Sequence, residues 1–144
     1  MREVDPAGES VARVLRAALE QSDLLVSDID YVCAHGNSLI DYDAAETAGI
    51  KLAFGRQASC IPVSSIKSMC GQALGASGAM QIVTACLSIR YNVVPPTINY
   101  AYPDPACDLD YVPNQSRSAR VQAAAVHAQS IGGSHSAVIL GAPN

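Results

Sequence analysis

The chain has 144 residues, of which 49% are hydrophobic and only 15% are charged, and its net charge is −4. These values predict one domain, or part of a larger one, with enough apolar residues for a core. The absence of a basic run argues against nucleic-acid binding. The chain starts without the apolar core of a signal peptide, and its uncharged stretch, 73–89, is too short and too polar for a membrane span. We therefore expect a cytoplasmic protein.

Helix and strand signals alternate through the first half of the chain. Apolar residues at a helical spacing predict an amphipathic helix over 7–21. A short buried strand is expected over 29–34, directly before His35. A second helix is predicted over 40–54, because Gly55 is a typical residue for the C-terminal end of a helix.

The second half is predicted to contain a short strand, one long buried helix, an irregular proline-rich segment and two apolar strands joined by a tight glycine turn. In chain order these are expected at 61–64, 72–90, 97–119, 122–129 and 136–140. Helices that alternate with strands and end in a hairpin predict an α/β fold with a mixed sheet.

Five cysteines are scattered through the chain, and none are spaced as Cys-x-x-Cys. They are Cys33, Cys60, Cys70, Cys86 and Cys107. This pattern favours neither a disulfide framework nor a zinc site, and we expect no bound metal. The interpretation that remains is a set of reduced thiols, most of them buried.

Several segments, in order, resemble the C-terminal half of a β-ketoacyl-[acyl-carrier-protein] synthase, which has the thiolase-like fold. They read Ala-His-Gly-Asn-Ser at 34–38, Lys-Ser-Met-Cys-Gly-Gln at 67–72, Val-Pro-Pro-Thr-Ile-Asn at 94–99, Cys-Asp-Leu-Asp-Tyr-Val-Pro at 107–113 and Ser-Ile-Gly-Gly-Ser-His at 130–135. The resemblance implies that residues 1–144 form the C-terminal domain, with a mixed five-stranded sheet, packed helices and a terminal hairpin. It also implies that the half with the nucleophilic cysteine lies outside this chain.

In that family the reaction is a decarboxylative Claisen condensation. A cysteine accepts an acyl chain from the phosphopantetheine arm of an acyl carrier protein, and a malonyl unit on a second carrier loses CO2 and attacks the new thioester. The chemistry needs an activated thiol and hydrogen-bond donors for two oxyanions. The resemblance therefore implies an acyl carrier protein as a partner and no resident cofactor.

The resemblance assigns four catalytic positions. His35 matches the first catalytic histidine, and Lys67 and Glu46 match a lysine and an acidic residue that we expect to form a buried pair. Gln72 stands where the family has its second catalytic histidine. A glutamine amide donates hydrogen bonds but does not titrate near neutral pH, so decarboxylation should be slowed.

Further substitutions surround these positions. Asn37 and Leu39 replace two threonines that follow the first histidine, and Ile131 replaces a phenylalanine. Residues expected in the substrate and oxyanion loop are Asn37, Ile131, Gly132, Gly133 and Ser134.

Three other residues at first suggest catalysis. His127 and His135 stand at asparagine positions of the family. We interpret His127 as a packing residue and do not interpret His135 as a transplanted catalytic histidine. Cys86 lies in a segment that looks like the nucleophile segment, but its place within the long helix argues against that role.

Three functional hypotheses follow. The first is a ketosynthase-like subunit impaired in condensation, similar to a chain-length factor or a non-elongating ketosynthase. The second is an active synthase half whose cysteine comes from another segment or chain, and the third is a purely structural module. The expected partners are an N-terminal ketosynthase half or ketosynthase subunit and an acyl carrier protein, in a hetero- or homo-oligomer. A solitary copy would leave an apolar face uncovered.

Overall fold

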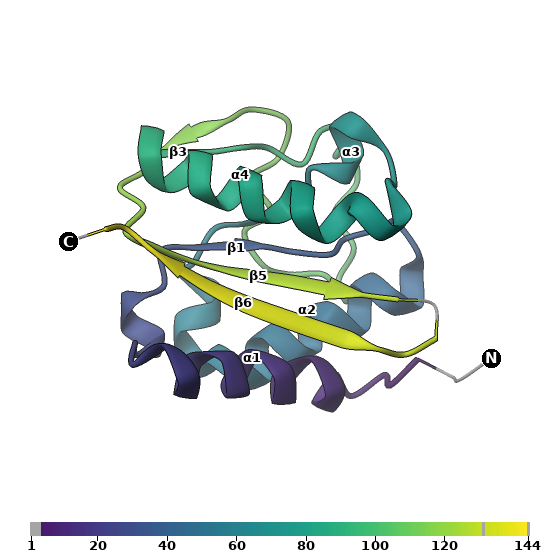
Figure 1. Cartoon of the computed structure of the whole chain (residues 1–144). Helices are drawn as coiled ribbons and strands as arrows, with labels where there is room; N and C mark the ends of the chain where they lie inside the picture. The colour runs from purple at the N-terminus through teal and green to yellow at the C-terminus, as the bar shows by residue number, and fades with distance from the viewer. Residues whose placement is uncertain (1–3, 131, 144) are drawn as a thin grey trace.

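The structure is a computed structural model that describes residues 4–130 and 132–143. A central sheet lies between two helices on one face, α1 and α2, and one helix on the other, α4 (Figure 1). The helices are α1 (Glu9–Ser22), α2 (Ile40–Phe54), α3 (Lys67–Cys70) and α4 (Ser77–Tyr91), with short 3-10 helices η1 (Val26–Asp28), η2 (Gly55–Ser59) and η3 (Leu74–Ala76). The strands are β1 (Tyr31–Cys33), β2 (Val63–Ser64), β3 (Val93–Val94), β4 (Arg117–Ser118), β5 (Ala123–Gln129) and β6 (His135–Gly141).

The main sheet is mixed, as predicted, with the strand order β2-β1-β5-β6. Strand β1 is parallel to both neighbours, with Val32 paired to Val63 on one side and to Ala125 on the other. Strands β5 and β6 form the predicted antiparallel hairpin. The expected count of five strands is wrong for the described residues, because this sheet has four. Strands β3 and β4 pair with each other instead, in a separate ribbon.

Most predicted elements lie within a few residues of their observed bounds. Helix α2 begins and ends at the predicted residues, with Asp41 and Asp43 in its first turn and Lys51 in its last, as the helix dipole favours. The prediction of one helix over 72–90 is wrong. Gly71 ends α3 with a φ of 77°, which side chains with a Cβ rarely adopt, and the regular helix resumes only at Ser77.

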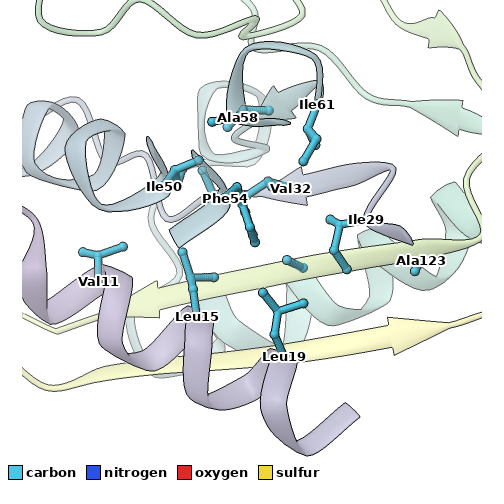
Figure 2. Packing of buried hydrophobic residues seen from close by; sticks show 13 residues of the cluster. Val11, Leu15, Leu19, Ile29, Val32, Ile50, Phe54, Ala58, Ile61 and Ala123 are labelled. Atoms are coloured by element: carbon cyan, nitrogen blue, oxygen red, sulfur yellow. The ribbon is translucent and has the colours of Figure 1, made fainter. Parts of the chain in front are cut away.

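Helix α1 buries an apolar stripe against α2 and the sheet (Figure 2). Its side chains Val11, Leu15 and Leu19 are almost fully buried. Each such side chain stabilises the fold by roughly 1.5–3 kcal/mol through removal from water. This layer also includes Ile50 and Phe54 of α2, so it fixes α2 beneath the sheet.

Helices α1 and α2 approach each other through a glycine. A Cβ atom added to Gly49 would lie 2.4 Å from Cβ of Val11 and 2.7 Å from the backbone oxygen of Gly8. No side chain fits at that distance, so only glycine permits this crossing. Glu46 lies one turn before Gly49 on α2.

Helix α4 places polar side chains against the sheet, next to Ala85 and the partly buried Ile82 and Ile89. Its buried residues are Ser77, Gln81, Ala85 and Ser88. The side-chain amide of Gln81 donates to the backbone oxygens of Ala34 and His127, each at 2.8 Å, and thereby joins α4 to two strands. The prediction of a buried helix therefore holds for one side only. The outward side exposes Met80 by 36%, Val83 by 57%, Leu87 by 49% and Tyr91 by 63%.

The cysteines are free thiols, but the prediction that most are buried is wrong. Only Cys33 is buried, in β1, whereas Cys60, Cys70 and Cys86 are exposed. Cys86 is exposed because it lies on the outward side of α4. Within residues 4–130 and 132–143, no helix combines the length and apolar character that a membrane crossing needs.

Candidate active site

The site lies where β1 and β2 end and the β5–β6 hairpin turns. His35 follows β1, Lys67 follows β2, and Gln129 is the last residue of β5. Because the carboxyl ends of neighbouring parallel strands meet at one edge of a sheet, this topology brings residues distant in sequence together. The same sheet edge is the usual location of ligand sites in α/β folds.

Glu46 holds the backbone of the loop after β1. Its Oε1 accepts the N–H of His35 at 2.7 Å, and its Oε2 accepts the N–H of Gly36 at 2.8 Å. Nδ1 of His127 lies 2.5 Å from Oε1. Burial favours a higher pKa for Glu46, but His127 and these two N–H groups outweigh it and hold the pKa below its ordinary value. Glu46 is therefore a buried, ionised carboxylate.

His35 is a neutral imidazole with a defined tautomer. The backbone N–H of Gln129 lies 3.3 Å from Nδ1 of His35, and because an N–H only donates, Nδ1 is the acceptor. The ring proton is then on Nε2. Burial, followed by the nearby Lys67 ammonium, lowers the pKa of His35 to about 4. At neutral pH this residue is thus an uncharged hydrogen-bond donor.

Lys67 supports His35 rather than Glu46. Its Nζ donates to the backbone oxygen of His35 and lies 3.5 Å from Nδ1 of the same residue. The predicted Lys67–Glu46 pair is wrong, because the carboxylate oxygens of Glu46 are occupied by His127 and by two backbone N–H groups. Burial lowers the pKa of Lys67, whereas the charge of Glu46 opposes that shift.

A cleft of about 590 Å³ opens above these residues. It brings together most of the residues predicted for the site: His35, Asn37, Gln72, Gly132 and Ser134. Glu46 and Lys67 are not among its lining residues and act through His35 and its loop. Gly133 borders a smaller neighbouring cavity, and Ile131 lies outside the described residues.

Gln72 is anchored at the start of α4. Its Oε1 accepts the hydroxyl of Ser77 at 2.8 Å, which leaves its amide N–H2 as the group able to donate to a ligand. Gln72 and His35 line the same cleft. The described lining residues of this cleft include no cysteine, and Cys86 is therefore not among them.

The turn between β5 and β6 closes on itself through backbone hydrogen bonds. The N–H of Ser130 donates to the oxygen of Ser134 at 2.9 Å, and the N–H of Gly133 donates to the oxygen of Ser130 at 3.0 Å. This confirms the predicted tight hairpin. The oxyanion role of Gly132 and its neighbours stays a prediction.

Two site residues were not recognised from the sequence. Asp43 accepts the N–H groups of Asn37 at 3.0 Å and Ser38 at 3.1 Å, and burial raises its pKa to about 6. Its position one turn before Glu46 on the same helix was the available signal. His127 was predicted to be a packing residue, which is incomplete: it is fully buried, but as the partner of Glu46.

Comparisons with known proteins point to one family. A family model described as the C-terminal domain of β-ketoacyl synthase matches residues 1–101. The ketoacyl synthase alpha subunit of tetracenomycin polyketide synthase from Streptomyces glaucescens is 43% identical over 99% of this chain and 34% of that protein. The granaticin polyketide putative β-ketoacyl synthase 1 from Streptomyces violaceoruber is 46% identical over 94% of this chain and 32% of that protein.

Solved structures agree in fold. The complex described as AntDE:AntF, a type II polyketide synthase acyl carrier protein with its ketosynthase bound to the hexaketide, matches with a TM-score of 0.96 and 39% identity over 100% of this chain and 35% of that chain. The ishigamide ketosynthase/chain length factor matches with a TM-score of 0.91 and 32% identity over 96% of this chain and 34% of that chain. This chain spans about a third of the length of these relatives. The family match and the fold together show that it belongs to the β-ketoacyl synthase family, as a C-terminal, thiolase-like domain.

Proposed function

We propose that this chain forms the C-terminal wall of a ketosynthase-type cleft whose condensation step is impaired, as in a non-elongating or chain-length-factor-like partner. The observation that supports this most directly is that His35 and Gln72 line one cleft. One position holds an imidazole, and the other, a histidine in the family, holds an amide. The proposed ligands are acyl and malonyl groups on the phosphopantetheine of an acyl carrier protein.

The chemistry explains why this exchange matters. When malonyl thioester loses CO2, the electron pair of the broken C–C bond moves onto the thioester oxygen. The enolate carbon then attacks the acyl thioester of a cysteine, a C–C bond forms and the cysteine thiolate leaves. His35, as a neutral Nε2–H donor, is suited to the enolate oxygen. Gln72 keeps a donor but loses the titrating imidazole, and such losses cost roughly 10²–10⁴-fold in rate.

The nucleophilic cysteine must come from outside the described lining of the cleft. The outward side of α4 supports a segment that covers it, because Val83, Leu87 and Tyr91 form an exposed apolar stripe. About two thirds of each relative lies beyond the matched region, which is enough chain for such a segment. We assign this place to a cysteine-bearing ketosynthase segment, in the same polypeptide or in another subunit. An acyl carrier protein is the second partner.

One observation favours an active synthase as the second candidate. The support around His35 is complete, with Glu46 on its backbone N–H and Lys67 on its backbone oxygen. If neutral hydrogen-bond donation is all that the second histidine supplies, Gln72 replaces it with a smaller loss of rate.

Decarboxylation of malonyl-carrier separates the candidates. The protein is assayed with its cysteine-bearing segment, and CO2 release by the wild type is compared with that by Gln72→His and Gln72→Ala. An impaired site predicts that Gln72→His raises the rate by about 10²-fold or more, while Gln72→Ala changes it little. A wild-type rate that Gln72→His leaves unchanged, and that Gln72→Ala lowers, supports the active synthase. A protein that binds no acyl carrier supports a purely structural module.

A further inference from the structure

Two of the three histidines of the chain contact the carboxylate of Glu46, His35 through its backbone N–H and His127 through its ring, and the third, His135, contacts His127. Nδ1 of His127 lies 2.5 Å from Oε1 of Glu46, and Nε2 of His127 lies 3.3 Å from Nδ1 of His135. The rings of His127 and His135 stack, with centroids 5.6 Å apart and planes at 16°. A carboxylate and two imidazoles thus form a continuous line from the core to the hairpin turn.

The line ends in the cleft. His127 and Glu46 are almost fully buried, whereas His135 lines both the cleft of His35 and Gln72 and a smaller polar cavity of about 140 Å³. The smaller cavity also contains Asp5 and Arg13. His135 therefore lies between a closed, charged interior and a space that a ligand can enter.

The hydrogen bonds define which nitrogen faces outward. The ionised Glu46 accepts the Nδ1–H of His127, so Nε2 of a neutral His127 is an acceptor. His135 then donates its Nδ1–H to that nitrogen, and its own Nε2 keeps a free lone pair. A carboxylate that orients an imidazole is the arrangement by which proteins prepare a general base. In this chain the oriented imidazole, His127, in turn orients a second one, His135.

We infer that His135 exchanges a proton with a thiol in this cleft during acyl transfer, with His127 and Glu46 as positioning residues. The inference rests on the proposed function, because the thiol is that of the cysteine-bearing segment. His135 takes the proton as the thiol S–H bond breaks and a bond forms between sulfur and the acyl carbon. The bond between the acyl carbon and the carrier sulfur then breaks, and His135 returns the proton to that sulfur.

The surroundings keep His135 in the basic form. Burial is the largest cause that lowers the pKa of His135, and the charge of Arg13 adds to it. The carboxylates of Glu46 and Asp5 oppose the shift without reversing it. A neutral imidazole at neutral pH is ready to accept a proton, which the amide of Gln72 does not do.

Acyl loading tests this role apart from decarboxylation. The protein with its cysteine-bearing segment is mixed with acyl-carrier, and transfer to the cysteine is followed by mass spectrometry from pH 5 to 8. Replacement by the asparagine of the family, His135→Asn, should lower the loading rate by about 10²–10⁴-fold and flatten its pH dependence. His127→Asn should lower the rate less, because it removes the acceptor that orients the ring of His135 but leaves His135 itself in place.

Imidazole 15N NMR supplies a readout independent of rate. With three histidines in the chain, each signal is assigned from its variant, and His135 should carry its proton on Nδ1 in the wild type. An Nε2 proton there, a loading rate unchanged in His135→Asn, or no loading by the wild type would each overturn the inference.

The outcome is separable from that of the proposed function. Unchanged loading in His135→Asn, together with faster decarboxylation in Gln72→His, overturns only the role of His135. Slower loading in His135→Asn, with no effect of Gln72→His on decarboxylation, supports that role and overturns only the impaired condensation. His135→Gln provides a second variant if His135→Asn does not fold.

Discussion

Helices α1 and α4 lie on opposite faces of one sheet (Figure 1). They differ in the polarity of the side chains that they bury against it. Helix α1 turns Val11, Leu15 and Leu19 inward and leaves charged residues outside. Helix α4 turns Ser77, Gln81 and Ser88 inward and leaves large apolar residues outside. The first pattern is that of a surface helix. The second is that of a helix with a polar contact on one side and a further apolar layer expected on the other.

The largest expected effect is a difference in the free energy of unfolding between two leucine-to-alanine variants. One leucine is on the buried side of α1 and the other is on the exposed side of α4. Leu15→Ala on α1 removes a fully buried side chain and should cost about 2–5 kcal/mol in the free energy of unfolding. Leu87→Ala on α4 removes a side chain that is 49% exposed and should cost no more than about 0.5 kcal/mol. Urea denaturation of the unassembled chain measures both. Equal losses would contradict the contrast between the helices.

Binding of the proposed cysteine-bearing segment should depend on the outward side of α4 and not on the exposed side of α1. A lysine in place of Val83, which is 57% exposed, should leave the unassembled chain stable. It should nevertheless weaken binding of the proposed cysteine-bearing segment by about 100-fold, because it puts a charge into an apolar contact. Glu20→Lys on the exposed side of α1 is the matched control. Sedimentation of the two components gives the affinities, and equal binding by both variants would argue against α4 as the contact surface.

Substitution of Gln81 tests how much the polar contact between α4 and the sheet stabilises the fold. Gln81→Leu leaves the backbone oxygens of Ala34 and His127 without their donor and should cost about 1–3 kcal/mol. Thermal unfolding measures the loss, with the exposed Gln57→Leu as control. A variant as stable as the wild type would indicate that the polar contact between α4 and the sheet contributes little.

The smallest effect is the pH dependence of folding stability that His35 causes. His35 lies in the loop after β1, which is bound from both helix layers: Glu46 of α2 accepts the N–H of His35, and Gln81 of α4 donates to the oxygen of Ala34. The pKa of His35 is lowered from 6.5 to about 4, so between these pH values the unfolded chain binds a proton that the folded chain does not. Folding stability from this group is present above pH 6.5 and falls on acidification, by about 1.4 kcal/mol per pH unit.

Asp43 acts in the opposite direction, because burial raises its pKa to about 6 and the folded chain then binds a proton that the unfolded chain does not. Because Asp43 is present in both proteins, its contribution cancels when the stability of the wild type is compared with that of His35→Asn. The stability difference between wild type and variant should shrink by about 1.4 kcal/mol from pH 6 to pH 5. A difference that does not change with pH would mean that His35 titrates normally.

The sequence was sufficient for features that depend on local pattern. Helix α2 was predicted at its observed bounds because its acidic first turn and Gly55 mark both ends. The hairpin was predicted because apolar strands flank a glycine pair. The start of α4 was misplaced, since the residue types Ala73, Leu74 and Ala76 are compatible with a continuous helix. The backbone interrupts that helix at Gly71, with a φ of 77°, and again at Leu74, with a φ of 49°.

The hydrogen-bond partners within the site could not be predicted from the sequence, because they lie on elements that are far apart along the chain. Lys67 and Glu46 carry opposite charges, so pairing them was reasonable, but Glu46 is satisfied by His127 from a strand 81 residues away. His127 sits among small apolar residues of β5 and resembled one more core position. The common cleft of His35 and Gln72 was expected from family resemblance rather than from spacing.

The close crossing of α1 and α2 has a consequence for enzyme design. The missing side chain at Gly49 lets α1 lie against α2 one turn from Glu46, and that carboxylate sets the orientation of the peptide groups of His35 and Gly36. Adding a single methyl group at position 49 would force the helices apart. The damage would then emerge at the loop after β1, so efforts to graft this cleft onto another scaffold must transplant the helix pair together with the residues that line the cleft.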